Sequence, residues 1–246
     1  RLAQAIPFNK WTTELCGEPK EVEDATYEEL PQKCLIVPFT SDKGLCGGVN
    51  SFITRSVKDC VAKLHAQGKD ADIVLIGDKG RAQLRRVMAD KIIRSATEVA
   101  APGTYGLASN LASELITAGA ADYDGVVLMY NSFKNAATYI QTYKVITPFV
   151  TMSESEESMS GYEFDGDKAE AMEDLYEYLL ASQVFHSFMD AAASEQSSRM
   201  TAMENASKNA NEMIDALTLK YNRVRQARIT TELIEIISGA SALEDN

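Results

Sequence analysis

The sequence has no glycine and no proline between Gly166 and Gly239, although the chain contains 14 glycines and 6 prolines. Because these two residues are the usual breakers of helices, the ordinary causes of a helix end are missing from this stretch. A helix over Asp167 to Ser238 would reach on the order of 100 Å at about 1.5 Å per residue. No compact domain of this size is that wide, so we expect a long helix that is not contained in a globular core.

Other absences exclude classes of protein. No apolar run approaches the roughly 20 residues of a membrane-spanning helix, so we expect no direct membrane span. Lys and Arg number 24 against 36 Asp and Glu, and the net charge of −12 argues against a nucleic-acid partner. Metal and disulfide sites are not expected, because CxxC and Cys/His spacings are missing around the four cysteines, Cys16, Cys34, Cys46 and Cys60.

The only glycine-rich loop that could hold a nucleotide is SDKGLCGGV, which starts at Ser41. It stands between a predicted strand and a predicted helix, where backbone N–H groups can approach a phosphate. It lacks both the GxxxxGK[ST] and the GxGxxG spacing, and Lys43 precedes the glycines. The pattern favours a tight turn, and we expect no cofactor and no catalytic residue. A small nucleotide-binding α/β enzyme is the alternative.

Strand and helix patterns alternate in the first two thirds of the chain, and this predicts an α/β fold with a mostly parallel, Rossmann-like sheet. Residues Ala5 to Lys33 are predicted to be an irregular connector with one short helix at Thr26 to Leu30. The predicted strands are Cys34 to Phe39, Ala71 to Ile76, Lys91 to Val99, Gly125 to Tyr130 and, at an edge, Tyr139 to Val150. The predicted helices are Gly48 to Leu64, Arg81 to Met88 and Ala108 to Ala118.

The chain is expected to divide into four parts. Residues 1–33 are interpreted as the end of an N-terminal shaft helix followed by a connector, and residues 34–152 as the α/β domain. Residues 153–166 form an acidic loop, and the 25 residues that start at Ser153 carry ten carboxylates and one lysine. Residues 167–246 are the long C-terminal helix.

Apolar residues in the long helix recur at spacings of three and four, which is the pattern of a coiled-coil seam. Such a seam needs a partner, and we expect an antiparallel helix contributed by sequence that precedes Arg1. A generic coiled-coil adaptor is a second alternative. The seam residues include Met172, Leu179, Met189, Met200, Met203, Ile214, Leu217, Tyr221 and Val224.

The amino-acid sequence of the last third of the chain is more specific than its periodicity. The segment ASEQSSRMTAMENASKNANEMIDALTLKYNRVRQARITTELIEIISGASAL resembles the C-terminal signature of the gamma subunit of rotary F-type ATP synthases. Upstream, CLIVPFTSDKGLCGGVNSFI is similar to the first strand, glycine turn and helix of that family. The resemblance covers nearly all of the chain. It implies a central-stalk rotor subunit that transmits torque between a proton-driven membrane ring and the catalytic alpha/beta hexamer.

The resemblance also implies which residues meet the partners. The segment that corresponds to RQARITTEL reaches loops of the catalytic subunits in this family, so Arg225, Gln226, Thr230, Arg228 and Glu232 are the predicted partner-binding residues. The end of the helix has little charge and resembles the family's apolar bearing. Its predicted members are Ile229, Leu233, Ile236, Ile237 and Leu243.

The partners implied by the resemblance are the alpha and beta subunits, the small central-stalk subunits of delta or epsilon type, and the membrane c-ring. The chain itself is expected to be a non-catalytic subunit. None of the four cysteines is close enough to another to match the regulatory pair of chloroplast members. We therefore expect the matrix side of the mitochondrial inner membrane, with the cytoplasmic face of a bacterial plasma membrane as the alternative.

Overall fold

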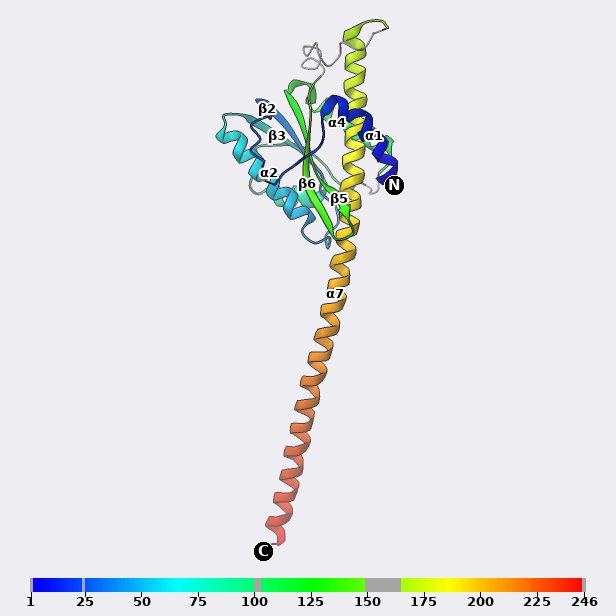
Figure 1. The fold of residues 1–246 in the computed structure, drawn as a ribbon. Coiled ribbons are helices and arrows are strands. Elements are labelled where there is room, and N and C mark those ends of the chain that lie inside the picture. Colours follow the sequence, from blue (N-terminus) through cyan, green and yellow to red (C-terminus); the bar gives the residue numbers. More distant parts are fainter. Residues whose placement is uncertain (1, 24, 100–102, 149–164, 245–246) are drawn as a thin grey trace. The chain divides into compact units, whose positions relative to one another are not determined.

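The computed structural model describes residues 2–23, 25–99, 103–148 and 165–244 (Figure 1). Its contacts divide the chain into two compact units, Arg1–Thr201 and Ala202–Asn246. The first unit holds the sheet, its covering helices and the beginning of α7 (Lys168–Glu244). The second unit is the remainder of α7.

The sheet has the strand order β1-β6-β5-β2-β3-β4. Its four central and outer strands β5 (Gly125–Asn135), β2 (Lys33–Pro38), β3 (Asp70–Ile76) and β4 (Ile92–Ala96) are parallel. On the other side, β6 (Thr138–Ile146) pairs antiparallel with β5, and the two-residue β1 (Lys20–Glu21) pairs antiparallel with β6. The prediction of an α/β fold with a mostly parallel sheet is confirmed.

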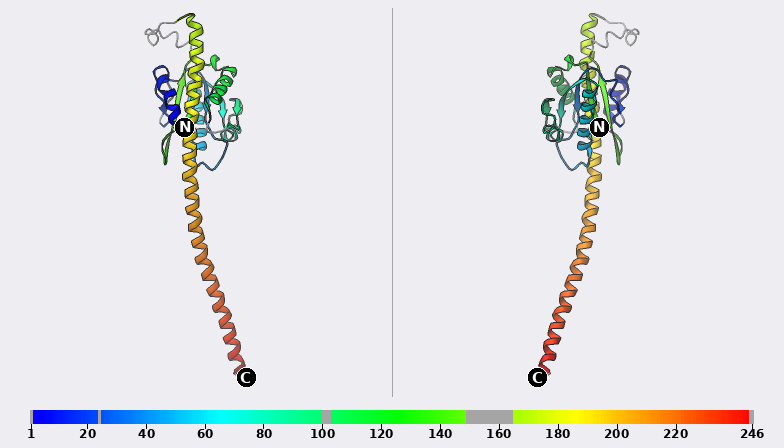
Figure 2. Two further views of the ribbon diagram at one scale, coloured as in Figure 1. Left: turned by 90° about the vertical axis from the view of Figure 1, so that its right-hand side faces the viewer. Right: turned by 90° about the vertical axis from the view of Figure 1, so that its left-hand side faces the viewer.

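Helices cover both faces of this sheet, which is why its central strands are apolar on both sides. On one face, α2 (Val49–Ala66) and α3 (Asp78–Leu84) bury Ile53, Val57, Leu64 and Leu84 against Ile36 and Leu75. On the other face, α1 (Leu2–Cys16), α4 (Tyr105–Thr117) and the first part of α7 cover Leu35, Val37 and Leu128. A short 3₁₀ helix (Ala120–Asp122) precedes β5. Figure 2 gives two side views of this arrangement.

The prediction of an irregular connector over Ala5 to Lys33 is wrong at its start. Residues Leu2 to Cys16 form α1, with Pro7 inside it, and β1 follows. The short helix expected at Thr26 to Leu30 is not formed, because the chain makes a turn there. Packing decides this segment: the Phe8 ring lies 5.2 Å from that of Phe185, and the Trp11 ring 5.3 Å from that of Tyr178. These contacts hold a helix that the local sequence alone does not indicate.

The other elements appear where the patterns place them, with shifted ends. Helix α3 ends at Leu84 and does not reach Met88, and β5 continues to Asn135 as one arm of a hairpin with β6. Strand β6 ends at Ile146, and residues 149–150 of the predicted strand lie outside the described residues. Most of the acidic loop, residues 153–164, also lies outside them.

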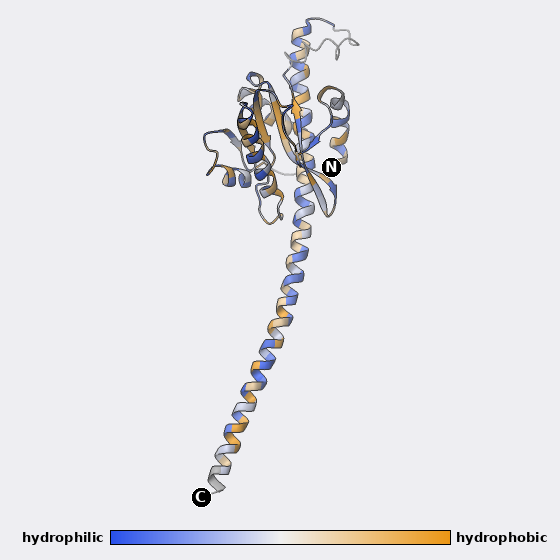
Figure 3. Ribbon diagram, turned by 60° about the vertical axis from the view of Figure 1, so that its left-hand side comes forward, coloured by the Kyte–Doolittle hydropathy of each residue, from blue (hydrophilic) through white to orange (hydrophobic). Residues whose placement is uncertain are grey.

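The long helix is confirmed, and α7 is 77 residues long. It also continues through Gly239, so this single glycine does not end it. From Met172 (1% exposed) to Met189 (3%) the seam is buried in the first unit. From Met200 onward it is open, as at Leu217 (58% exposed) and Tyr221 (66%), and Figure 3 shows hydrophobic and hydrophilic residues alternating along this helix. Among the helices that the structure describes, none has the length and apolar character of a membrane span.

Candidate functional site: the clamp between α7 and the sheet

The carboxyl ends of the parallel strands are where ligands bind in folds of this type, at the point where the strand order reverses. Here that point lies between β2 and β5, because the chain passes from β2 to β3 on one side and returns through β5 on the other. Helix α7 is bonded to the chain at this edge of the sheet. We therefore treat the contacts between α7 and the strand ends as the candidate functional site.

Asp190 is a buried carboxylate that makes two of these contacts. One carboxylate oxygen accepts a hydrogen bond from the Ser132 hydroxyl at 2.8 Å, and the other accepts one from the Phe133 N–H at 2.8 Å. Burial raises the pKa of this carboxyl group, while the two hydrogen bonds oppose the rise. The end of β5 is thus tied to one turn of α7 through both oxygens of a single side chain.

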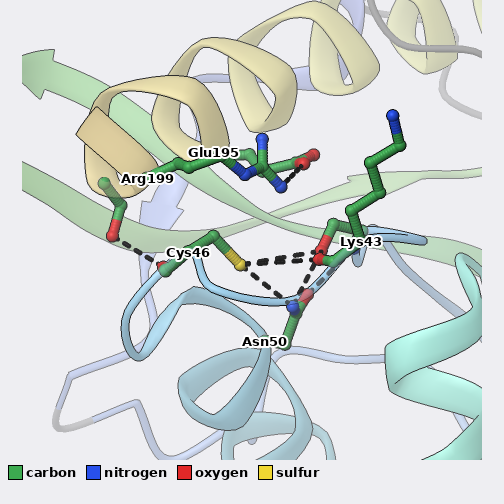
Figure 4. Close-up of polar contacts among 7 residues, drawn as sticks. Lys43, Cys46, Asn50, Glu195 and Arg199 are labelled. Carbon is green, nitrogen blue, oxygen red and sulfur yellow. Dashed lines mark hydrogen bonds and ion pairs between the residues drawn. The ribbon is translucent and has the colours of Figure 1, made fainter. Parts of the chain in front are cut away.

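Three serines extend the contact along the same side of the helix. Ser194 donates to the Asn131 carbonyl at 2.8 Å, and Ser197 donates to the Ala136 carbonyl at 2.6 Å. Ser198 donates to the Cys46 carbonyl at 2.7 Å, in the glycine-rich loop (Figure 4). We call Asp190, Ser194, Ser197 and Ser198 the clamp. Ser194 lies four positions after Asp190, and Ser197 and Ser198 lie three and four positions after Ser194, so the four residues share one side of the helix and bond three separate segments of the domain.

The glycine-rich loop is a structural turn. Gly47 has φ +62°, and a Cβ atom added there would lie 2.9 Å from the Ser198 Oγ atom. Asn50 closes the loop, because its Oδ1 accepts from the Ser41 N–H at 2.9 Å and its Nδ2 donates to the Ser41 Oγ at 2.8 Å. Its Nδ2 also lies 3.2 Å from the Cys46 sulfur. Ser41 and Asn50 are therefore already bonded to each other within the loop.

A cavity of about 400 Å³ lies beside this loop. Its polar lining contains one cation, Lys43, whose side chain points away from Asn50 and Cys46 in Figure 4. Three carboxylates line it as well, from Asp42, Glu98 and Glu195. Glu195 is paired with Arg199 one turn further along α7, at 2.5 Å. A site with this balance of charge repels a polyphosphate, so the cavity does not favour the nucleotide-binding alternative.

The partner-binding residues predicted from the sequence do not belong to the clamp. They lie on α7 in the second unit, where their side chains are exposed. Arg228 forms an ion pair with Glu232 at 2.9 Å, and the Thr230 hydroxyl donates to the Gln226 carbonyl at 2.9 Å. Arg225 is exposed as well and has no hydrogen-bond or ion-pair partner in the described part of the chain.

The apolar bearing residues are also exposed in the second unit. The exposed fractions are 48% for Ile229, 52% for Leu233, 69% for Ile236 and 60% for Ile237. The side chain of Leu243 lies outside the described residues.

Sequence reasoning missed all four clamp residues. A signal was present, because DAAASEQSS interrupts the apolar seam with small and polar residues at spacings of three and four. Such a pattern is also common on exposed helix faces, and only the positions of β5 and the glycine-rich loop distinguish the two. No group of three or more possible metal ligands is found in the part of the chain that the structure describes.

The fold and the clamp define a class of protein in which a Rossmann-like domain is bonded to a long α-helix at the carboxyl ends of its parallel strands. Comparison with known proteins makes the class specific. The family model described as ATP synthase matches residues 1–243. The chain is 44% identical over 217 residues to the mitochondrial ATP synthase F(1) complex subunit gamma of Rattus norvegicus. The aligned region covers 88% of this chain and 78% of the relative.

A bacterial relative gives the same result. The ATP synthase gamma chain of Paramagnetospirillum magneticum is 39% identical over 233 residues, covering 92% of this chain and 78% of the relative. Among solved structures, the central stalk and c-ring of Tetrahymena thermophila mitochondrial ATP synthase matches with a TM-score of 0.63 at 33% identity, covering 76% of this chain and 84% of that one. The Euglena gracilis mitochondrial enzyme shares the fold, with a TM-score of 0.77 at 19% identity over 98% of this chain and 85% of that one. The chain belongs to the ATP synthase gamma-chain family.

Proposed function

We propose that this chain is the central-stalk rotor subunit of an F-type ATP synthase. It transmits torque between the proton-driven membrane c-ring and the alpha/beta hexamer, and it carries out no chemistry of its own. The observation that carries this proposal is the clamp, because a helix can deliver torque to a domain only when the two are bonded in a fixed rotational position. Family membership supplies the rest of the support.

The mechanism is mechanical. An asymmetric helix meets three catalytic subunits that are otherwise equivalent, and each orientation favours a different state of the subunit that it faces. A rotor can shift such an equilibrium only by differential contact energy between the states. Arg225, Gln226 and Thr230, together with Arg228 and Glu232, supply directional contacts of this kind toward loops of the catalytic subunits.

The apolar end has the opposite task. Ile229, Leu233, Ile236 and Ile237 are exposed, and together with Leu243 they form a bearing surface within a collar of partner side chains. Apolar contacts are not directional, so a rotor held by them meets no deep energy wells as it turns. The exposed seam from Met200 to Val224 is covered by a second helix of the stalk or by the inner wall of the hexamer.

The clamp links these contacts to the rest of the rotor. Its hydrogen bonds each contribute about 0.5–1.5 kcal/mol in net terms, and leaving the buried Asn131 carbonyl without its Ser194 partner costs roughly 1–3 kcal/mol. The apolar packing of Leu179, Val184 and Phe188 on the same helix adds to this. Twisting α7 against the sheet therefore breaks several buried contacts at once.

The partners are the alpha and beta subunits, the small central-stalk subunits of delta or epsilon type, and the c-ring. The relatives are mitochondrial and bacterial proteins. We place this chain on the matrix side of the mitochondrial inner membrane, with the cytoplasmic face of a bacterial plasma membrane as the alternative. Relatives from Rattus norvegicus and Drosophila melanogaster, at 44% and 42% identity, support the first location.

Co-purification tests the proposal directly. A complex isolated through a tag on the beta subunit is expected to contain this chain with alpha, beta and a c-ring, and to pump protons when it hydrolyses ATP. Recovery of the chain only as a free monomer would overturn the proposal. Isothermal titration of ATP onto the free chain tests the enzyme alternative, and saturable binding with a micromolar Kd would support that alternative instead.

A further inference from the structure

Strand β4 lies at the end of the sheet order, and within the described residues it pairs with β3 alone. Its three middle residues, Ile93, Arg94 and Ser95, are exposed. Alternate residues of an edge strand direct their N–H and C=O groups away from the sheet, where a strand from another protein can pair with them. The outer edge of β4 therefore offers a template for main-chain hydrogen bonds.

A basic cavity lies next to this edge. Its volume is about 340 Å³, and it is lined by Arg81, Arg85, Ala89, Ile92 and Ser95. Arg81 lies in the last turn of α3 and Arg85 is the C-cap residue of this helix. The end of α3 thus places two guanidinium groups at one cavity.

Within the described residues, Arg81 and Arg85 have no ion-pair partner, whereas Lys91 and Arg94 of the β4 segment do. Lys91 pairs with Asp70 at 2.6 Å, and Arg94 pairs with Glu114 at 2.8 Å. In the described part of the chain, no carboxylate lies within ion-pair distance of Arg81 or Arg85. This includes Asp90, which is close to them in the sequence. The chain has 36 acidic residues against 24 basic ones, so a positive cavity with no internal counter-charge is unusual in it.

Exposed apolar side chains flank the same surface. Val87 is 66% exposed and Ile93 is 42% exposed. Together, the free strand edge, the arginine cavity and these two side chains define the β4 surface. A small free anion would use only the cavity, whereas an extended peptide would use all three features.

We propose that the β4 surface binds an extended acidic segment of another subunit, which adds a strand to the outer edge of β4 and places a carboxylate in the cavity. Arginine suits this role because its planar guanidinium group can hold a carboxylate through two parallel hydrogen bonds. Main-chain pairing supplies affinity, and side chains at alternate positions supply specificity. This inference rests on the proposed function, since the partner is a component of the assembled ATP synthase.

The test uses the assembled complex, purified through a tag on beta, with Ile93 replaced by the photo-crosslinking residue benzoylphenylalanine. After irradiation, mass spectrometry identifies the crosslinked peptide. We expect it to come from another subunit and to carry carboxylates. Arg81→Glu together with Arg85→Glu is expected to reduce the crosslink yield at least tenfold. If this charge-reversed variant does not assemble, the milder variant Arg81→Lys with Arg85→Lys is measured in its place.

The matched control is Arg55→Glu together with Lys58→Glu on α2, which makes the same change of charge elsewhere on the domain and should leave the yield unchanged. Crosslinks confined to this chain, crosslinks to a segment without carboxylates, or a yield insensitive to Arg81 and Arg85 would overturn the inference alone. Protection of these arginines from phenylglyoxal by inorganic phosphate, without a crosslink, would assign a small anion and also overturn it. A chain that fails to co-purify with alpha and beta overturns the proposed function, and the inference with it.

Discussion

The carboxylate of Asp190, on α7, lies 2.8 Å from the hydroxyl of Ser132, near the end of β5. The two residues are 58 positions apart in the sequence. The second oxygen accepts the Phe133 N–H at the same distance. One buried side chain therefore satisfies two donors on β5. Its removal leaves both donors without their partner, and the first prediction follows from this.

Asp190→Ala is expected to lower the free energy of unfolding of the first unit by roughly 1–3 kcal/mol, because it removes the acceptor of two part-buried donors. Urea denaturation of the full chain, followed by circular dichroism, measures this change. Asp215→Ala provides the control, because Asp215 is exposed on the same helix and should change stability little. Equal losses from the two variants would remove Asp190 from the clamp.

The glycine-rich loop gives a second prediction. Gly47→Ala places a methyl group 2.9 Å from the Ser198 Oγ atom and forces a non-glycine residue to adopt φ +62°. We expect a loss of stability of about 1–2 kcal/mol, which is in the range of a strained backbone. In the double variant with Ser198→Ala, the steric part of the loss should disappear while the backbone part remains.

Gly44→Ala is the matched control for this loop. Gly44 does not have a positive φ, and the nearest atom to an added Cβ lies 3.8 Å away, in Lys79. Its substitution should leave the melting temperature nearly unchanged. If Gly44→Ala were as harmful as Gly47→Ala, the close approach of Ser198 would not be the reason for glycine at position 47.

A third prediction concerns pH. Burial lowers the pKa of His186 from about 6.5 to about 4, with a smaller effect from the charge of Lys144. The unfolded chain therefore binds a proton more readily than the folded chain does. The stabilisation from neutral His186 is fully present above pH 6.5 and is lost as pH falls toward 4, by about 3 kcal/mol in all.

Comparison of the wild type with His186→Gln isolates this contribution. The raised pKa of Asp190 acts in the opposite direction over the acid range, and it is common to both proteins. The free energy of unfolding, measured by urea at intervals between pH 7 and pH 4.5, should fall more steeply in the wild type. Parallel curves would show that His186 does not titrate differently in the two states.

The fourth prediction tests the partner-binding residues. Arg225→Glu together with Gln226→Ala is expected to weaken the coupling between ATP hydrolysis and proton pumping in the assembled complex, because the directional contacts of the helix with its partners are lost. The urea transition of the first unit should be unchanged. Lys208→Glu, an exposed charge change on the same helix, is the control. Unaltered coupling in a correctly assembled complex would exclude Arg225 and Gln226 from torque transmission.

The sequence indicated the sheet well because central parallel strands are short apolar runs, as in β2, β3 and β5. It failed from Ala5 to Cys16, where an irregular connector was predicted and contacts with the rings of Phe185 and Tyr178, more than 160 residues away, hold α1. Local patterns cannot report contacts of that sequence separation. The ends of α3 and β5 were shifted for the same reason, since their neighbours fix where they stop.

The functional residues were likewise predicted only in part from the sequence. Arg225, Gln226 and Thr230 were predicted from the resemblance, and the structure shows that they are exposed on α7. The clamp was not identified, because a serine that bonds a distant carbonyl looks the same in sequence as a serine that bonds water. Only the fold brings Ser198 to the Cys46 carbonyl.

Helix α7 runs from Lys168 to Glu244 without a loop. A loop or hinge would act as a swivel and would absorb part of any imposed rotation before passing the remainder on, whereas the hydrogen bonds of an unbroken helix store twist elastically and return it. Such a helix can twist elastically, but it has no joint with free play. A rotation imposed on this helix, in either direction, would therefore not be absorbed at a loop within it.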